Sequence, residues 1–256
     1  MSWAARRRFI ILLIVGAVVG AFLATLFIAT FYDAPSCTDG TQNQDEVGID
    51  CGGSCAYLCT AQLQPPTVLF TKALSYGGDR TDVIASVENK NATAAAKNVP
   101  YRITLYGSGQ ALIQEVTGTL DLPPAASVPV FVPGIVSGKQ MVVGVFLTIA
   151  PSAPQWFSLA TTARSLPLVS NIRQSGTVDA PRVEAVFTNS TVIPFNNVRT
   201  IVLVRDKSGD VIAASQTVVP SIPAQGQAVA TFSWNNAFPA TPATIEVIPI
   251  IPLPDR

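Results

Sequence analysis

The hydrophobic pattern of the chain changes once, from a single unbroken apolar run to short alternating segments. No charged residue falls between Phe9 and Tyr32, and the run shows no polar face. A helix of this length is long enough to cross the roughly 30 Å of bilayer hydrocarbon with some tilt. The pattern predicts a basic tip at residues 1–8 and a transmembrane helix over residues 9–32, with the lipid bilayer as a partner.

The charge in front of the apolar run predicts the orientation of the helix. Arg6, Arg7 and Arg8 precede the run, and basic residues stay on the cytoplasmic side of a membrane. A cleaved signal peptide shares the basic start, but its apolar region covers only about 7–15 residues and ends in a small-x-small site. We therefore expect a single-pass anchor in the plasma membrane, with the N-terminus cytoplasmic and the C-terminal bulk extracytoplasmic.

Small residues recur along the predicted helix at Gly16, Gly20 and Ala24. Such a stripe lets two membrane helices approach closely, which makes self-association through the helix one hypothesis. The alternative, which we favour, is that glycine and alanine are simply common in transmembrane helices.

Beyond Pro65 and Pro66, short alternating segments are separated by proline, glycine and asparagine, a pattern typical of a β-sandwich. The pattern also repeats, because at a constant shift along the chain the same residues return. Four such matches are Val83 with Val183, Asn89 with Asn189, Gly109 with Gly209 and Pro123 with Pro223. The remaining length suits two domains, so we predict one sandwich over residues 65–152 and a second over residues 153–256.

Two tryptophans raise the question of a ligand platform, since exposed aromatic side chains can stack on sugars. In the second predicted sandwich, alternation places Phe232 and Trp234 on one face of a strand. We expect Trp156 and Trp234 to belong to the cores instead.

Composition removes several classes of function. Only 12% of the residues are charged, the formal net charge is zero and histidine is absent. After Arg8 no basic stripe appears, which disfavours a nucleic-acid partner. Without histidine, a P-loop or a Gly-x-Ser-x-Gly motif, the chain offers no recognisable catalytic pattern, and we predict that it is not an enzyme.

All cysteines fall in a short stretch after the predicted anchor, within a stalk module that we place at residues 33–64. An even number of cysteines outside the cytoplasm predicts two disulfides. Zinc is the competing hypothesis, but the spacing lacks Cys-x2-Cys pairs and there is no histidine. Three connectivities remain open for Cys37, Cys51, Cys55 and Cys59.

The same stretch is rich in oxygen-bearing side chains, which are the ligands that calcium prefers. A calcium site is therefore one hypothesis. The alternative, which we favour, is a solvated acidic turn clamped by disulfides, and we expect no other cofactor. The candidate calcium ligands are Asp39, Asn43, Asp45, Glu46 and Asp50.

The cysteine stretch resembles a short acidic module of bacterial surface proteins, with the pattern Cys-x-Asp-Gly, Asn, Glu and Asp-Cys-Gly-Gly-x-Cys. It departs from that module at Cys59, which three residues rather than two separate from Cys55. The stretches Val99–Gly107 and Val202–Gly209 resemble the aromatic-x-Leu-Tyr-Asp signature of FxLYD-type domains, relatives of the late-embryogenesis-abundant sandwich. Gly107 replaces the expected aspartate, and in the second copy Val204-Arg205 replaces Leu-Tyr.

This resemblance implies fibronectin-like sandwiches used for adhesion, display or spacing, in an envelope protein of small-genome candidate-phylum bacteria. The predicted fold class is thus all-β, with a single N-terminal transmembrane helix, a small disulfide-rich module and two tandem immunoglobulin/fibronectin-like β-sandwiches. We expect a membrane-anchored structural, adhesive or protein-binding scaffold whose partners are other envelope or surface proteins. The alternatives are an accessory subunit of a secretion or pilus-type assembly and a calcium-stabilised surface ligand-binding protein.

Overall fold

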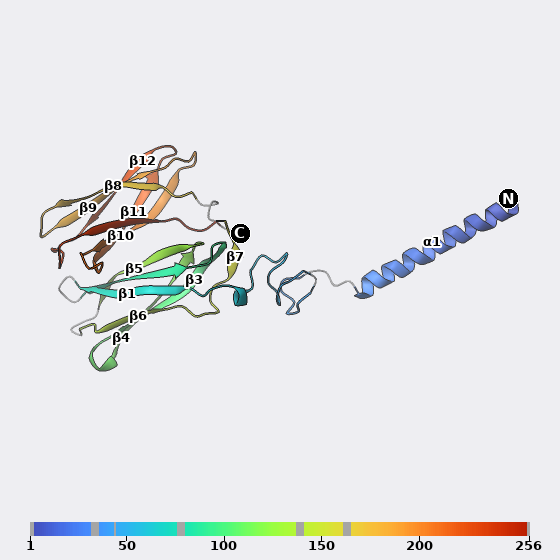
Figure 1. Ribbon diagram of the computed structural model, residues 1–256, viewed down its shortest axis with the longest axis horizontal. Coiled ribbons are helices and arrows are strands. Elements are labelled where there is room, and N and C mark those ends of the chain that lie inside the picture. Colours follow the sequence, from blue (N-terminus) through green and yellow to red (C-terminus); the bar gives the residue numbers. More distant parts are fainter. Residues whose placement is uncertain are drawn as a thin grey trace. The chain divides into compact units, whose positions relative to one another are not determined.

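The computed structural model describes residues 3–31, 36–43, 45–75, 80–136, 141–160 and 165–254. The chain is all-β apart from one N-terminal helix, as predicted (Figure 1). It divides into two compact units, Met1–Cys55 and Ala56–Arg256, which are described separately. Tyr32, the last residue of the predicted anchor, lies outside the described residues.

The first unit begins with helix α1 (Trp3–Phe31). Within the described part of the chain, α1 is the one helix long and apolar enough to cross a membrane, and none of its apolar stretch is buried by protein. The hydroxyls of Thr25 and Thr30 donate to the carbonyls of Ala21 and Leu26, one turn earlier in the helix. These two hydroxyl groups are therefore hydrogen-bonded within the helix itself.

The second unit consists of strands and short turns. The first half contains the short helix η1 (Thr60–Gln62) and strands β1 (Thr67–Ser75), β2 (Arg80–Asn89), β3 (Ala94–Tyr106), β4 (Leu112–Leu122), β5 (Ala126–Val136), β6 (Gly144–Thr148) and β7 (Trp156–Ser158). A second short helix, η2 (Ser108–Gln110), joins β3 to β4. The second half contains β8 (Leu168–Gly176), β9 (Pro181–Thr188), β10 (Phe195–Arg205), β11 (Val211–Ile222), β12 (Gln227–Ser233) and β13 (Thr244–Ile250).

The first sandwich is formed by the sheets β1-β2-β5 and β4-β3-β6, with β7 also paired to β3. Every pairing in these sheets is antiparallel. Alternation along β2 and β3 turns Val83, Val87, Ile103 and Leu105 into one shared core. Trp156 is buried in this core, as predicted.

The second sandwich is formed by the antiparallel sheets β12-β9-β8 and β11-β10-β13. Its core combines Phe187 of β9, Val202 of β10 and Phe232 of β12. Trp234 is buried here and donates its indole N–H to the carbonyl of Ala214, which confirms the prediction of a core position.

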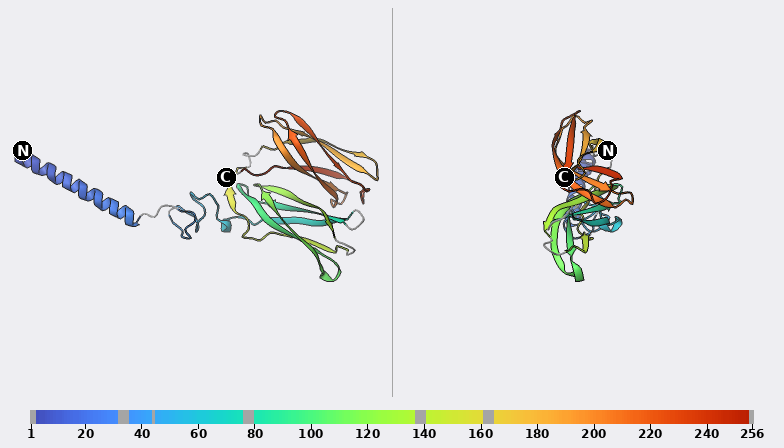
Figure 2. Two further views of the ribbon diagram at one scale, coloured as in Figure 1. Left: turned by 180° about the vertical axis from the view of Figure 1, so that it is seen from behind. Right: turned by 90° about the vertical axis from the view of Figure 1, so that its left-hand side faces the viewer.

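A third apolar cluster joins the two sandwiches. Ile84 of β2 is fully buried although it lies on the strand face opposite Val83, and it packs with Ile201 and Leu203 of β10. The four sheets therefore lie in successive layers, and the sheets β1-β2-β5 and β11-β10-β13 face each other in the middle (Figure 2). Each of these inner sheets is buried on both faces.

Residues near the C-terminus also contact the first sandwich. The backbone N–H of Leu253 donates to the carboxylate of Asp121, and the Leu253 side chain is buried with Ala95 and Phe157.

Strand β7 lies in the range predicted for the second sandwich, yet it pairs with β3 of the first. The reason is packing, since Trp156 completes the first core.

Candidate functional site

The outer face of the sheet β4-β3-β6 is the candidate site. The other sheet of the first sandwich is covered by the second sandwich, whereas this face presents its side chains to solvent. Because Ile103 and Leu105 point into the core, alternation turns Thr104 and Tyr106 outward. In the register, Thr104 lies opposite Phe146 and Tyr106 lies opposite Gly144.

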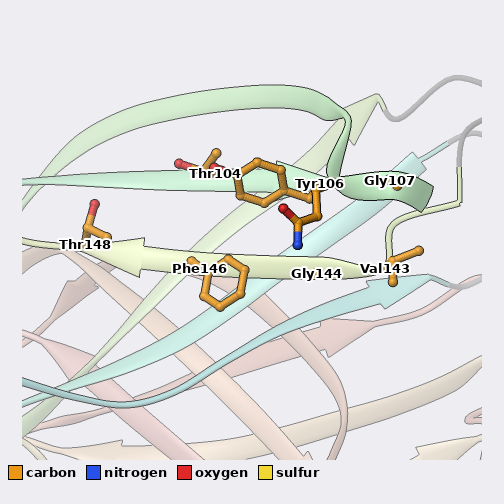
Figure 3. Close-up of a pocket in the computed structure, with 9 residues that line it drawn as sticks. Thr104, Tyr106, Gly107, Val143, Gly144, Phe146 and Thr148 are labelled. Carbon is orange, nitrogen blue, oxygen red and sulfur yellow. The ribbon is translucent and has the colours of Figure 1, made fainter.

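An open groove of about 710 Å³ lies on this face, at the end of the sandwich that carries the β3–β4 turn (Figure 3). The rings of Tyr106 and Phe146 stand 6.0 Å apart at an interplanar angle of 67°. Phe146 is 59% exposed, which is unusual for a phenylalanine. Of the residues that line the groove, none is charged.

Glycines leave the space that the groove occupies. A side chain added at Gly144 would come within 3.4 Å of the Phe146 ring, and one at Gly107 within 3.4 Å of Ile113. The chain enters the sandwich at the opposite end, where Gln64 and Asn91 exchange two hydrogen bonds. The groove thus lies at the end of the sandwich opposite Gln64 and Asn91.

The two corners at Asn89 and Asn189 are built from the same hydrogen bonds. The Asn89 amide donates to the carbonyls of Ala94, Leu122 and Pro123. The Asn189 amide donates in the same way to three carbonyls, those of Ile193, Ile222 and Pro223. Asn189 begins an Asn-x-Thr sequence, but its amide is buried and fully engaged, so that sequence is not accessible to glycosylation.

The stalk module contains two disulfides, as predicted. Cys37 and Cys55 are bonded to each other. Cys51 and Cys59 are disulfide-bonded as well, and none of the chain's cysteines is free. The pairing of Cys37 with Cys55 selects among the three open connectivities.

The candidate calcium ligands bond mainly to the module's own backbone. The carboxylate of Asp50 accepts from the N–H groups of Asp39 and Gly40. The carboxylate of Glu46 is buried and accepts from the N–H groups of Asn43 and Asp50. These side chains therefore act as acceptors for backbone N–H groups of the module's own turns.

The two other aspartates, Asp39 and Asp45, also accept hydrogen bonds from residues of the module. Asp39 accepts from the backbone N–H and the hydroxyl of Thr41, and these bonds lower the pKa of its carboxyl group. Asp45 accepts from the hydroxyl of Ser54. Calcium binding by the module stays a prediction, which calorimetry of the full chain with calcium would test.

One group of candidate metal ligands lies close together among the described residues, namely Cys37, Glu46 and Cys55. Its two sulfur atoms are bonded to each other. A disulfide has no thiolate to offer a metal, so this group is a structural cluster.

The remaining predicted residues lie on α1. Arg6, Arg7 and Arg8 are exposed, and the guanidinium of Arg7 stands 4.5 Å from the centre of the Trp3 ring. No atom lies within 4 Å of the side-chain positions at Gly16 and Gly20, so the small-residue stripe is uncovered in the single chain. The self-association that Gly16, Gly20 and Ala24 suggest stays a prediction.

Sequence reasoning missed Phe146 as part of a surface site. The signal was present, because Leu147 belongs to the core and its neighbour must therefore face outward. What the sequence did not reveal is that this sheet face stays uncovered.

Comparison with known proteins assigns no family to the chain. No protein-family profile and no curated protein sequence matches it. A solved structure, a transglutaminase of red sea bream, matches with a TM-score of 0.23 and 14% identity, over 73% of this chain and 29% of that one. A similarity this weak carries no argument about activity.

Proposed function

We propose that the protein is a membrane-anchored extracytoplasmic scaffold that displays the exposed face of its first sandwich to a partner, without catalysis. The observation that carries the proposal is the groove at Tyr106 and Phe146, which is aromatic and open to solvent. Soluble proteins rarely leave large apolar side chains gathered on a surface without a binding role.

The proposed location rests on the helix and the disulfides together. Helix α1 is apolar and uncovered by protein, and disulfides persist in oxidising compartments. The proposed orientation places Arg6, Arg7 and Arg8 in the cytoplasm, since basic residues remain on that side. A protease added to intact cells should then cleave the sandwiches; full protection that ends only when the membrane is opened would contradict this orientation.

We also propose that the sandwiches are immunoglobulin/fibronectin-like copies of one ancestral domain, similar to the FxLYD type, in a bacterial envelope protein. The matched hydrogen bonds at Asn89 and Asn189 support a duplication, because two independent sandwiches would have no reason to share them. The stalk's resemblance to the acidic cysteine module supports the same class of protein.

The alternative candidate is an accessory subunit of a secretion or pilus-type assembly. The two candidates differ in what they bind, since an adhesive protein binds cells or polymers and a subunit keeps one fixed protein partner. Sheet β12-β9-β8 ends in β8, an edge strand that a partner strand could extend. A bulge between Ser170 and Arg173 interrupts its register, however, and such bulges protect edges against pairing.

A photo-crosslinking amino acid at Gln110, on the rim of the groove, would test the proposal in membranes of the native host. We expect the same product in repeated experiments and none from the matched position Ser233, an exposed residue of β12. A polymer product supports adhesion, and a single protein product supports the accessory subunit. If Gln110 gives no product that Ser233 does not also give, the displayed-face proposal is wrong.

A further inference from the structure

The face that carries the groove continues beyond it along the same sheet. A second hollow of about 540 Å³ shares Thr148 with the groove and reaches Thr117 and Thr119 of β4. Together the two hollows form a track that begins at the aromatic pair and follows β3. A track of this kind suits an extended polymer better than a compact molecule.

The track is electrically neutral and rich in hydroxyl groups. Arg102, the charged residue among those that line it, forms an ion pair at 3.2 Å with neighbouring Glu115, so its charge is compensated. The hydroxyls of Thr104 and Thr117 can each donate one hydrogen bond and accept others, whereas that of Thr148 donates to the carbonyl of Arg102 at 3.4 Å and can still accept. A partner matched to this surface is uncharged and carries groups that both donate and accept.

We propose that this track binds a neutral polysaccharide, an inference that rests on the proposed display function. The apolar face of a sugar ring would stack on the exposed ring of Phe146, which packs edge to face against Tyr106. Sugar hydroxyls both donate and accept, as the threonine hydroxyls along the track do. The pattern is that of a binding site in general, with aromatic side chains for contact and a few polar groups for orientation.

A proline-rich peptide is the other extended ligand that docks on aromatic grooves. Its prolines have no N–H, so it presents mainly carbonyl acceptors. Such a peptide would leave the oxygen atoms of the threonine hydroxyls without a hydrogen-bond donor. The donor and acceptor balance therefore favours the sugar.

The test uses the full chain in phosphatidylcholine nanodiscs, which contain no sugar headgroups, and measures binding by biolayer interferometry. The immobilised probes are neutral hexasaccharides of glucose in α and β linkage and of N-acetylglucosamine, with a decaproline peptide and a polyuronate for comparison. We expect at least one neutral hexasaccharide to bind. Phe146→Ala and Tyr106→Ala should each weaken that binding by about tenfold, equivalent to about 1.4 kcal/mol.

Val229→Ala is the matched control, because Val229 is an equally exposed apolar residue on β12, outside the track. It should leave binding unchanged. Phe146 is largely exposed, so its variant should keep the unfolding temperature of the wild type, which is measured in parallel.

Three results would overturn the inference: no binding of any neutral hexasaccharide at millimolar concentration, binding that both aromatic variants retain, or tighter binding of decaproline or polyuronate at the same residues. The crosslink at Gln110 distinguishes failure of the polysaccharide inference from failure of the display function. A specific crosslinked protein without sugar binding removes only the polysaccharide, whereas the absence of both removes the display function as well.

Discussion

Two asparagine side chains hold the corners of the sandwiches together. At each corner one buried amide donates to three backbone carbonyls, and its oxygen accepts from a backbone N–H two residues on. The sequence showed that Asn89 and Asn189 are matched positions of the repeat. It could not predict the acceptors Leu122 and Pro123, which lie far along the chain and meet the amide only in the folded sandwich.

Replacing either corner asparagine should destabilise the protein. In Asn89→Ala and Asn189→Ala, buried carbonyls lose their donor, which costs about 2 kcal/mol of the free energy of unfolding. Urea unfolding of the full chain in nanodiscs measures this cost. Asn196→Ala, at an exposed position of β10, is the control and should change stability by less than about 0.5 kcal/mol. Equal stability of the control and the corner variants would refute the role of these amides.

Asp39 makes the stalk module sensitive to acid. Its pKa lies below the usual value because Thr41 bonds to the ionised form. A depressed pKa means that the carboxylate stabilises the folded module above the pKa of the unfolded chain, and that this contribution is lost as pH falls through the folded pKa. The amide resonance of Thr41 should therefore titrate below the pH at which a free aspartate titrates. The Asp39→Asn variant should lack the transition, and a midpoint at or above the free value would contradict the assignment.

At the scale of elements, the module is a loop held by covalent bonds and turn contacts. Its turns also need glycine. Gly52 has a φ of 75°, a backbone conformation that residues with a side chain disfavour. A side chain at Gly53 would collide with the backbone carbonyl oxygen of Asp45. The pattern of cysteines and glycines predicted a loop held by disulfides, but only the folded loop shows which cysteines are bonded to each other.

Reduction should unfold the module and spare the sandwiches. The bridge between Cys37 and Cys55 closes a loop with a sequence separation of 18 residues, for which the chain-entropy effect is about 3 kcal/mol. In a reducing buffer, amide resonances of residues 36–43 should collapse to unstructured positions while those of β3 and β10 stay dispersed. The double variant Cys37→Ser/Cys55→Ser in oxidising buffer is the matched control. Loss of the β3 resonances on reduction would show that the sandwiches depend on the bridges.

At the scale of the whole second unit, the sandwiches behave as one body because they share a core. Ile84 is as fully buried as Val83, although the two side chains point to opposite faces of β2. The guanidinium of Arg205 adds to the contact, 5.3 Å from the centre of the Phe70 ring. Strands buried on both faces contain continuous apolar runs, as Val83–Ala85 and Ile201–Val204 do.

Truncating Ile84 should loosen the second sandwich as well as the first. Ile84→Ala leaves a cavity in the shared cluster and should cost about 2–5 kcal/mol. Hydrogen exchange should then speed up at Ile201 and Leu203, which belong to the other sandwich. Val229→Ala serves as the exposed control. Unchanged protection of β10 in Ile84→Ala would mean that the sandwiches are independent.

The sequence by itself determined the local features of this protein, because they depend on neighbouring residues alone. The apolar helix, the core positions of Trp156 and Trp234 and the presence of two disulfides all follow from local pattern and composition. Tertiary structure decided which cysteines pair, which sheet faces are covered and where β7 and Leu253 belong. Those outcomes depend on contacts between segments far apart in the chain. The candidate groove exists because no such segment covers the outer face of the sheet β4-β3-β6 in the described structure.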